Sequence, residues 1–165
     1  MKLDFTKALN QPNQKFDFTF EWEPKPEMFS NTPHEPMGSG EINVAYSAGE
    51  FGNVNLQIEI RIPFEFYCDK CGVRFKKNLY LTSSEQVKAE ESEDYFSYDA
   101  NNEVEIDEIV EQVIISSFPQ KVLCNPNCKG LCPTCGINLN HETCDCGNKK
   151  IGKNNPFGQL LGKIQ

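Results

Sequence analysis

The chain has 165 residues, 38% of them hydrophobic, and a formal net charge of −8. This length suffices for one domain with a buried core, and no apolar run is long enough to cross a bilayer, so we expect a cytoplasmic protein without a membrane partner. An acidic chain is repelled by a phosphate backbone, so any nucleic-acid contact must be local or mediated by a partner.

Alternation of apolar and polar side chains predicts strands with one buried face in three stretches, 15–22, 41–47 and 54–66. The stretch 23–40 is rich in proline and glycine, which predicts a loop, and we expect its His34 to be solvated. Pro63 has no backbone N–H to donate to a ladder. It therefore predicts an edge, a bulge or a bend in the third strand.

The third strand leads directly into Cys68-Asp-Lys-Cys71-Gly72, and an alternating pattern resumes from Val73 to Leu81. Two strands joined by such a turn form a zinc-knuckle hairpin. Gly72 tolerates the positive φ that lets backbone amides turn toward the sulfur atoms.

Acidic residues dominate the chain from about 85 to 105, which we interpret as a solvated loop. Asp107 can cap a helix that runs from Ile109 to Phe118 and ends before Pro119. The apolar stripe of this helix is expected to pack on the sheet. The predicted fold class is α+β: an antiparallel twisted sheet or open barrel, one packing helix, and a cysteine-rich zinc-binding C-terminal part.

Six of the eight cysteines lie within 124–146. In a reducing compartment, closely paired cysteines indicate metal binding before they indicate disulfides, and thiolates are the preferred structural ligands of zinc. We therefore expect two zinc ions, each bound by four thiolates. The predicted ligands are Cys68, Cys71, Cys124, Cys128, Cys132, Cys135, Cys144 and Cys146.

Two pairings of these cysteines fit the spacing, and His141 could replace one thiolate. The favoured pairing closes one site within 132–146 and uses the remaining cysteines for the other, because each site then needs only one loop closure. The alternative joins the two CxxC turns, at 68–71 and 132–135, as a zinc ribbon.

A shell of four thiolates leaves no position for water or substrate, so we expect no enzyme activity and no small-molecule substrate. One alternative is a thiol- or metal-dependent enzyme, which would need an exposed reactive cysteine or an incomplete shell. Another is a general protein-adaptor zinc module.

The chain divides into a single α+β domain, 1–146, which includes the zinc-binding segment 124–146, and a basic tail, 147–165. In the tail, Asn155 and Pro156 are suited to start a helix. Apolar residues follow at helical spacing and predict a short amphipathic helix: Phe157, Leu160, Leu161 and Ile164.

The cysteine motifs resemble those of the YceD family, whose members are described as large ribosomal RNA subunit accumulation proteins. The resemblance rests on Cys68-x-x-Cys71, on Cys124-x-x-x-Cys128-Lys-Gly-Leu-Cys132-Pro-x-Cys135-Gly-x-Asn138-Leu139-Asn140, and on Asn155-Pro156-Phe157 in the tail. It implies a non-enzymatic cytoplasmic factor in ribosome biogenesis that supports accumulation or processing of large-subunit ribosomal RNA. The implied partner is this RNA or its precursor, or a ribosomal protein of the large subunit.

Local basic residues could contact RNA despite the acidic balance of the chain. The candidate RNA or partner contacts are Lys129, Lys149, Lys150, Lys153, Phe157 and Leu160. The alternative is that these lysines offset the negative zinc–thiolate centres, since the sequence shows no arginine-rich stripe and no aromatic stacking platform.

Overall fold

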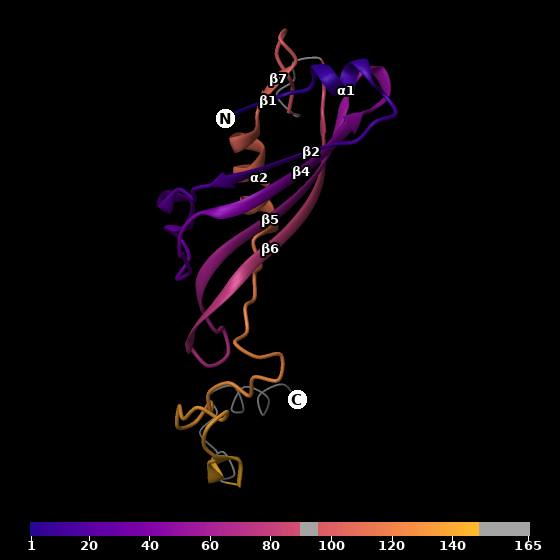
Figure 1. Cartoon of the computed structure of the whole chain (residues 1–165). Helices are drawn as coiled ribbons and strands as arrows, with labels where there is room; N and C mark the ends of the chain where they lie inside the picture. The colour runs from indigo at the N-terminus through magenta and orange to yellow at the C-terminus, as the bar shows by residue number, and fades with distance from the viewer. Residues whose placement is uncertain (90–95, 149–165) are drawn as a thin grey trace, which may run out of the picture.

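The longest alternating pattern of the sequence forms the central strand of an antiparallel sheet (Figure 1). This structure is a computed structural model, and it describes residues 1–89 and 96–148. β5 (Val54–Tyr67) pairs along its whole length with β6 (Arg74–Val87). The other edge of β5 is shared by β4 (Gly40–Ala48) and the short β3 (Glu35–Pro36). β2 (Phe16–Trp22) lies beside β4.

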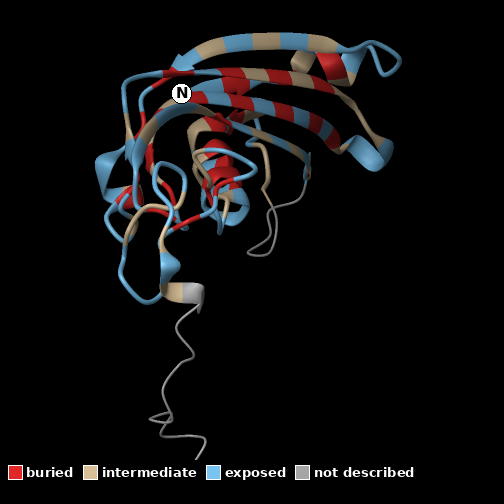
Figure 2. Cartoon of the chain, turned by 90° about the horizontal axis from the view of Figure 1, so that it is seen from below, coloured by how far each residue is buried: buried red, intermediate tan, exposed pale blue. Residues whose placement is uncertain are grey.

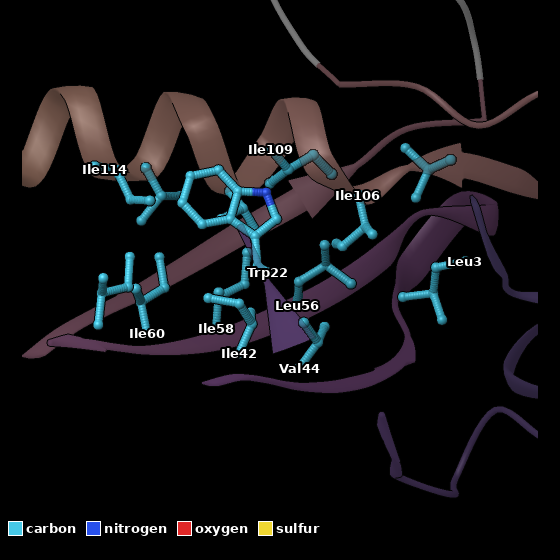
Figure 3. Packing of buried hydrophobic residues seen from close by; sticks show 14 of the residues in the cluster. Leu3, Trp22, Ile42, Val44, Leu56, Ile58, Ile60, Ile106, Ile109 and Ile114 are labelled. Carbon is cyan, nitrogen blue, oxygen red and sulfur yellow. The ribbon is translucent and has the colours of Figure 1, made fainter. Parts of the chain in front are cut away.

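One face of the sheet is buried against α2 (Ile106–Ser117), and the sheet curves over this helix (Figure 2). Every second side chain of β5 points into the interior. Trp22 lies between α2 and the sheet, among Ile42, Ile58 and Ile109 (Figure 3). Full burial of each aliphatic side chain is worth about 1.5–3 kcal/mol, so this layer supplies much of the stability of the fold.

The N-terminal residues close one end of this layer. β1 (Lys2–Asp4) pairs with β7 (Glu103–Glu105), and α1 (Thr6–Asn10) follows β1. Between β1 and α1, Phe5 is fully buried and packs against the rings of Tyr46 and Tyr98, at centroid distances of 5.6 and 6.0 Å. Three 3₁₀ turns complete the described structure: η1 (Pro26–Phe29), η2 (Glu50–Gly52) and η3 (Asp145–Asn148).

The predicted α+β class and the antiparallel sheet are confirmed, with α1 as a short second helix that the pattern did not predict. The predicted cap of α2 was wrong. The helix begins at Ile106, and Asp107 lies in its first turn, where its carboxylate binds the N-terminal ammonium group of Met1. A carboxylate is favourable there because it faces the positive end of the helix dipole.

The acidic stretch predicted as a loop at about 85–105 is partly strand. β6 continues through Val87 and β7 begins at Glu103, so the connection between these strands spans 88–102. The division of the chain into 1–146 and 147–165 stays a prediction, and the predicted tail helix at 155–165 lies outside the described residues. No described helix is long and apolar enough to cross a membrane.

The expectation that His34 is solvated was wrong, because the loop that carries it folds back over the end of the sheet. Its side chain is only 7% exposed, and Nδ1 accepts a hydrogen bond from the backbone N–H of Tyr67 at 3.2 Å. The ring packs against Phe66 and Phe118. Burial lowers the pKa of His34, so the neutral acceptor form is favoured.

Pro63 lies inside the central strand, where the sequence predicted an edge, a bulge or a bend. Its carbonyl accepts a hydrogen bond from the N–H of Met37 at 2.8 Å, on the edge where β3 ends and β4 has not yet begun. A residue without an N–H is tolerated at this gap because the neighbouring chain leaves the regular ladder there.

Two isoleucines of α2 test the contribution of this helix to stability. Ile109 is fully buried and Ile115 is 60% exposed. We expect Ile109→Ala to lower the free energy of unfolding by about 2–5 kcal/mol, because it leaves a cavity against the sheet. Ile115→Ala, which changes helix propensity equally, should cost less than about 0.5 kcal/mol. Urea unfolding of both variants measures this difference, and equal costs would contradict the packing of α2 described above.

Candidate metal centre

Four cysteines meet where the β5–β6 hairpin touches the chain that follows α2. Cys68 and Cys71 come from the hairpin turn, and Cys124 and Cys128 from the later segment. The Sγ atoms of Cys68 and Cys128 lie 3.7 Å apart, and those of Cys71 and Cys124 lie 3.6 Å apart. Sulfurs bound at about 2.3 Å to one tetrahedral ion are about 3.8 Å apart. These two distances fit a tetrahedral shell, and all four sulfur atoms of this first group lie within 4.8 Å of one another.

The hairpin turn is tied directly to the segment after α2. Asp69 donates its backbone N–H to the carbonyl of Val122 at 3.0 Å, and its carboxylate accepts the N–H of Val122. These two bonds join residues that are far apart in the sequence. They hold the two cysteine pairs of the first group at one place.

A second group lies entirely within the C-terminal segment and contains Cys132, Cys135, Cys144 and Cys146. Its CxxCG turn repeats the geometry of the hairpin turn. In the hairpin, Gly72 N–H donates to the Cys68 carbonyl at 2.8 Å, and in the second group Gly136 N–H donates to the Cys132 carbonyl at 2.9 Å. Both glycines have positive φ, of 67° and 76°, which a residue with a Cβ adopts at a cost.

Asn140 connects the two groups. It follows the second CxxCG turn, yet its side-chain Nδ2 donates to Cys128 Sγ of the first group at 3.3 Å. Its Oδ1 accepts the backbone N–H of Lys129 at 2.8 Å, and Asn138 Oδ1 accepts the backbone N–H of Asn140 at 3.0 Å. A donor to a thiolate ligand orients that ligand and stabilises its charge. The sequence offered only the Asn138-Leu139-Asn140 string as a signal for this role.

The backbone around Gly130 makes the second contact between the groups. Leu131 donates its N–H to the carbonyl of Lys70 at 3.1 Å, and Lys70 Nζ donates to the carbonyl of Cys128 at 3.2 Å. Gly130 has φ of 80°, and a Cβ at this position would lie 3.0 Å from the Lys70 carbonyl oxygen. Only glycine allows the two chains to approach this closely.

Crowding of the thiols separates their pKa values within each group. Burial opposes ionisation of Cys68, but backbone N–H groups outweigh it and lower the pKa to about 6, whereas burial and neighbouring thiols raise the pKa of Cys124 to about 12. In the second group, backbone N–H donors lower the pKa of Cys132 to about 6, while the thiol of Cys135 and burial raise that of Cys146 to about 12. Four thiolates therefore need a cation to coexist, and a set of four sulfur ligands suits zinc or iron.

Comparison with known proteins identifies the family. The family model described as "Large ribosomal RNA subunit accumulation protein YceD" matches residues 56–162, more than half of the chain. The chain belongs to the YceD family. The match includes both cysteine groups and confirms the resemblance seen in the motifs.

Two plant relatives share the name "Large ribosomal RNA subunit accumulation protein YCED homolog 1, chloroplastic". The Arabidopsis thaliana protein is 33% identical over 64 residues, which are 38% of this chain and 20% of the relative. The Zea mays protein is 40% identical over 53 residues, which are 32% of this chain and 18% of the relative. The alignments thus span about a fifth of each relative. No solved structure matches the chain.

In this YceD chain the cysteines meet in the pairing that the loop-closure argument favoured, and the zinc-ribbon alternative is not formed. His141 belongs to neither group. Of the predicted RNA or partner contacts, Lys129 is exposed on the segment between the groups. The other five lie outside the described residues: Lys149, Lys150, Lys153, Phe157 and Leu160.

Alanine substitutions at Gly130 and Gly136 distinguish two costs to the free energy of unfolding, that of positive φ and that of a steric clash. A Cβ at Gly136 would meet no atom within 4 Å, unlike one at Gly130. We expect Gly136→Ala to destabilise the protein by about 1 kcal/mol and Gly130→Ala by about 2–3 kcal/mol. Urea unfolding under reducing conditions compares them. An equal loss in the two variants would show that Gly130 is not packed against Lys70.

Proposed function

We propose that this YceD-family chain is a non-enzymatic, zinc-stabilised factor that supports accumulation or processing of large-subunit ribosomal RNA during ribosome assembly. It does so through contact with the precursor RNA or with a ribosomal protein of the large subunit. The observation that carries this proposal is the family match over 56–162, because that range holds both four-cysteine groups.

Zinc is the metal that best suits both groups. Its structural sites are tetrahedral and closed, and thiolates supplied by CxxC turns are its usual ligands. Closely spaced cysteines that bind metal are typical of a reducing compartment, and we infer a cytoplasmic location. Bound zinc would act by joining the β5–β6 hairpin to the segment after α2, through Cys68, Cys71, Cys124 and Cys128.

We propose that the chain is not an enzyme, because each cysteine group can supply all four ligands of a metal ion. Each group supplies four sulfur ligands, so a metal held by all four has no position left for water or substrate. In the first group, Cys68, Cys71 and Cys128 are also buried, which protects them from reaction.

Native mass spectrometry under reducing, non-chelating conditions tests the zinc proposal. We expect two zinc ions per chain. Cys128→Ser should retain only the ion of the second group and Cys135→Ser only that of the first, because a missing thiolate opens one shell. Both variants lose one thiol, so each serves as the control for the other.

Alkylation of the folded, zinc-loaded protein provides the second measurement. Protection of all eight cysteines is the expected result. A mass without zinc would contradict the metal assignment, and one fast-reacting cysteine would favour a thiol enzyme.

The ribosomal role is tested by removing the chain from the cells that produce it. We expect the ratio of large-subunit to small-subunit ribosomal RNA to fall, and re-expression of the wild-type chain to restore it. Re-expression of Cys128→Ser is the matched comparison, because it opens the first metal site. An unchanged ratio after complete depletion would reject the proposed function.

A further inference from the structure

A groove follows the free edge of β6 close to the first cysteine group. Two hollows, of about 240 and 420 Å³, share Lys77, Lys121 and Leu123 in their linings, so they adjoin each other and are together called the groove. One wall is β6 and the other is the chain after α2, which runs from Pro119 to Pro126 (Figure 1). Within the described part of the chain, β6 pairs only with β5, so the opposite edge of β6 is open to a ligand.

The charge of this groove is opposite to that of the whole protein. Lys76, Lys77 and Lys121 line it and are exposed, and none of the residues that line the two hollows is acidic. No ion pair within residues 1–89 and 96–148 involves these three lysines. In a chain of net charge −8, such a local basic region attracts a polyanion to one place.

The groove also has aromatic and apolar side chains beneath its lysines. Phe75 is partly buried and packs against Phe66, with ring centroids 5.9 Å apart. Leu79 and Leu123 extend this apolar surface. Single-stranded nucleic acid is held by this combination, in which bases stack on aromatic faces and lysines contact phosphates.

Lys77 argues against a protein strand as the occupant. It lies opposite Phe64 in the register of β5 and β6, so its side chain is on the inner face of the sheet, yet it is exposed. An inward-facing charge on an edge strand is a device that prevents pairing with another strand. The same lysine is favourable beside a phosphate.

We propose that the groove between β6 and residues 119–126 binds single-stranded RNA, with Lys77 and Lys121 on phosphates and Phe75 beneath a base. This inference rests on the proposed function and adds to it. It names RNA as the direct partner and moves the contact to a surface that the sequence motifs did not indicate.

Fluorescence anisotropy of a labelled, mixed-sequence single-stranded RNA of about 12 nucleotides tests this site. The test variant is Lys77→Gln with Lys121→Gln in the zinc-loaded full chain. The control is Lys7→Gln with Lys15→Gln, because these two lysines are also exposed and lie outside the groove. We expect the test variant to lose about tenfold in affinity, and its slope of log K against log salt to fall by about 1.4, since two phosphate contacts are removed. The control should bind like the wild type.

The variant Phe75→Leu distinguishes the contribution of base stacking to RNA affinity from the contribution of charge. It keeps an apolar side chain but removes the aromatic face, so affinity should fall about fivefold or more while the salt slope stays unchanged. Because Phe75 also packs against the first cysteine group, the zinc content of this variant is measured first. A duplex of the same RNA should bind more weakly, since its bases cannot stack on Phe75.

Three outcomes would overturn this inference. Equal RNA affinity in the two lysine variants would place the RNA elsewhere, and equal affinity for the duplex would exclude a single-stranded site. A wild-type chain that binds no RNA, although its depletion lowers large-subunit ribosomal RNA, would make a protein the partner and leave the proposed function standing. Conversely, loss of RNA binding in the groove variant, together with unchanged ribosomal RNA after depletion, would support the groove and reject only the proposed function.

Discussion

The structure depends on one long-range closure, the meeting of Cys68 and Cys71 with Cys124 and Cys128. The hairpin that carries the first pair grows out of the central strand, and the second pair follows the helix that covers the sheet. This closure holds the chain after α2 against the hairpin, and apolar packing on the sheet holds the helix along its length. Three of these four cysteines are buried, and the four sulfur atoms lie close enough together to hold one metal ion, so a metal would strengthen a closure that hydrophobic burial already favours.

The second group is organised relative to the first. It could close by itself within a short loop, but its orientation comes from contacts that reach back to the hairpin: Asn140 at the sulfur of Cys128, and Gly130 against the carbonyl of Lys70. The two groups are therefore joined to each other at one end of the molecule. A bound metal ion in each group would stabilise this end, which has no large hydrophobic core of its own.

The proposed RNA contact depends on how the fold distributes charged side chains over the surface. The chain is acidic as a whole, yet the groove beside the first group is lined by lysines and by no acidic residue. Folding separates these basic side chains from the acidic ones, because it brings Lys77 of β6 and Lys121 of the segment after α2 into one groove. In a chain of net charge −8, a local basic groove would favour one defined contact with a polyanion over general attraction to nucleic acid, because the overall charge repels phosphate.

The sequence by itself determined the features that depend on local spacing. The alternation along 54–66 predicted the central strand, and the CxxCG spacing predicted a turn with positive φ at Gly72, a geometry that the structure repeats at Gly136. It also indicated the cysteine pairing, since loop closure favours short connections. Only the tertiary structure decided that His34 is buried, that Asn140 supports a ligand of the other group, and that Lys77 and Lys121 share a groove. These features depend on residues that are distant along the chain, and no local pattern of apolar or polar side chains encodes which distant segments will meet.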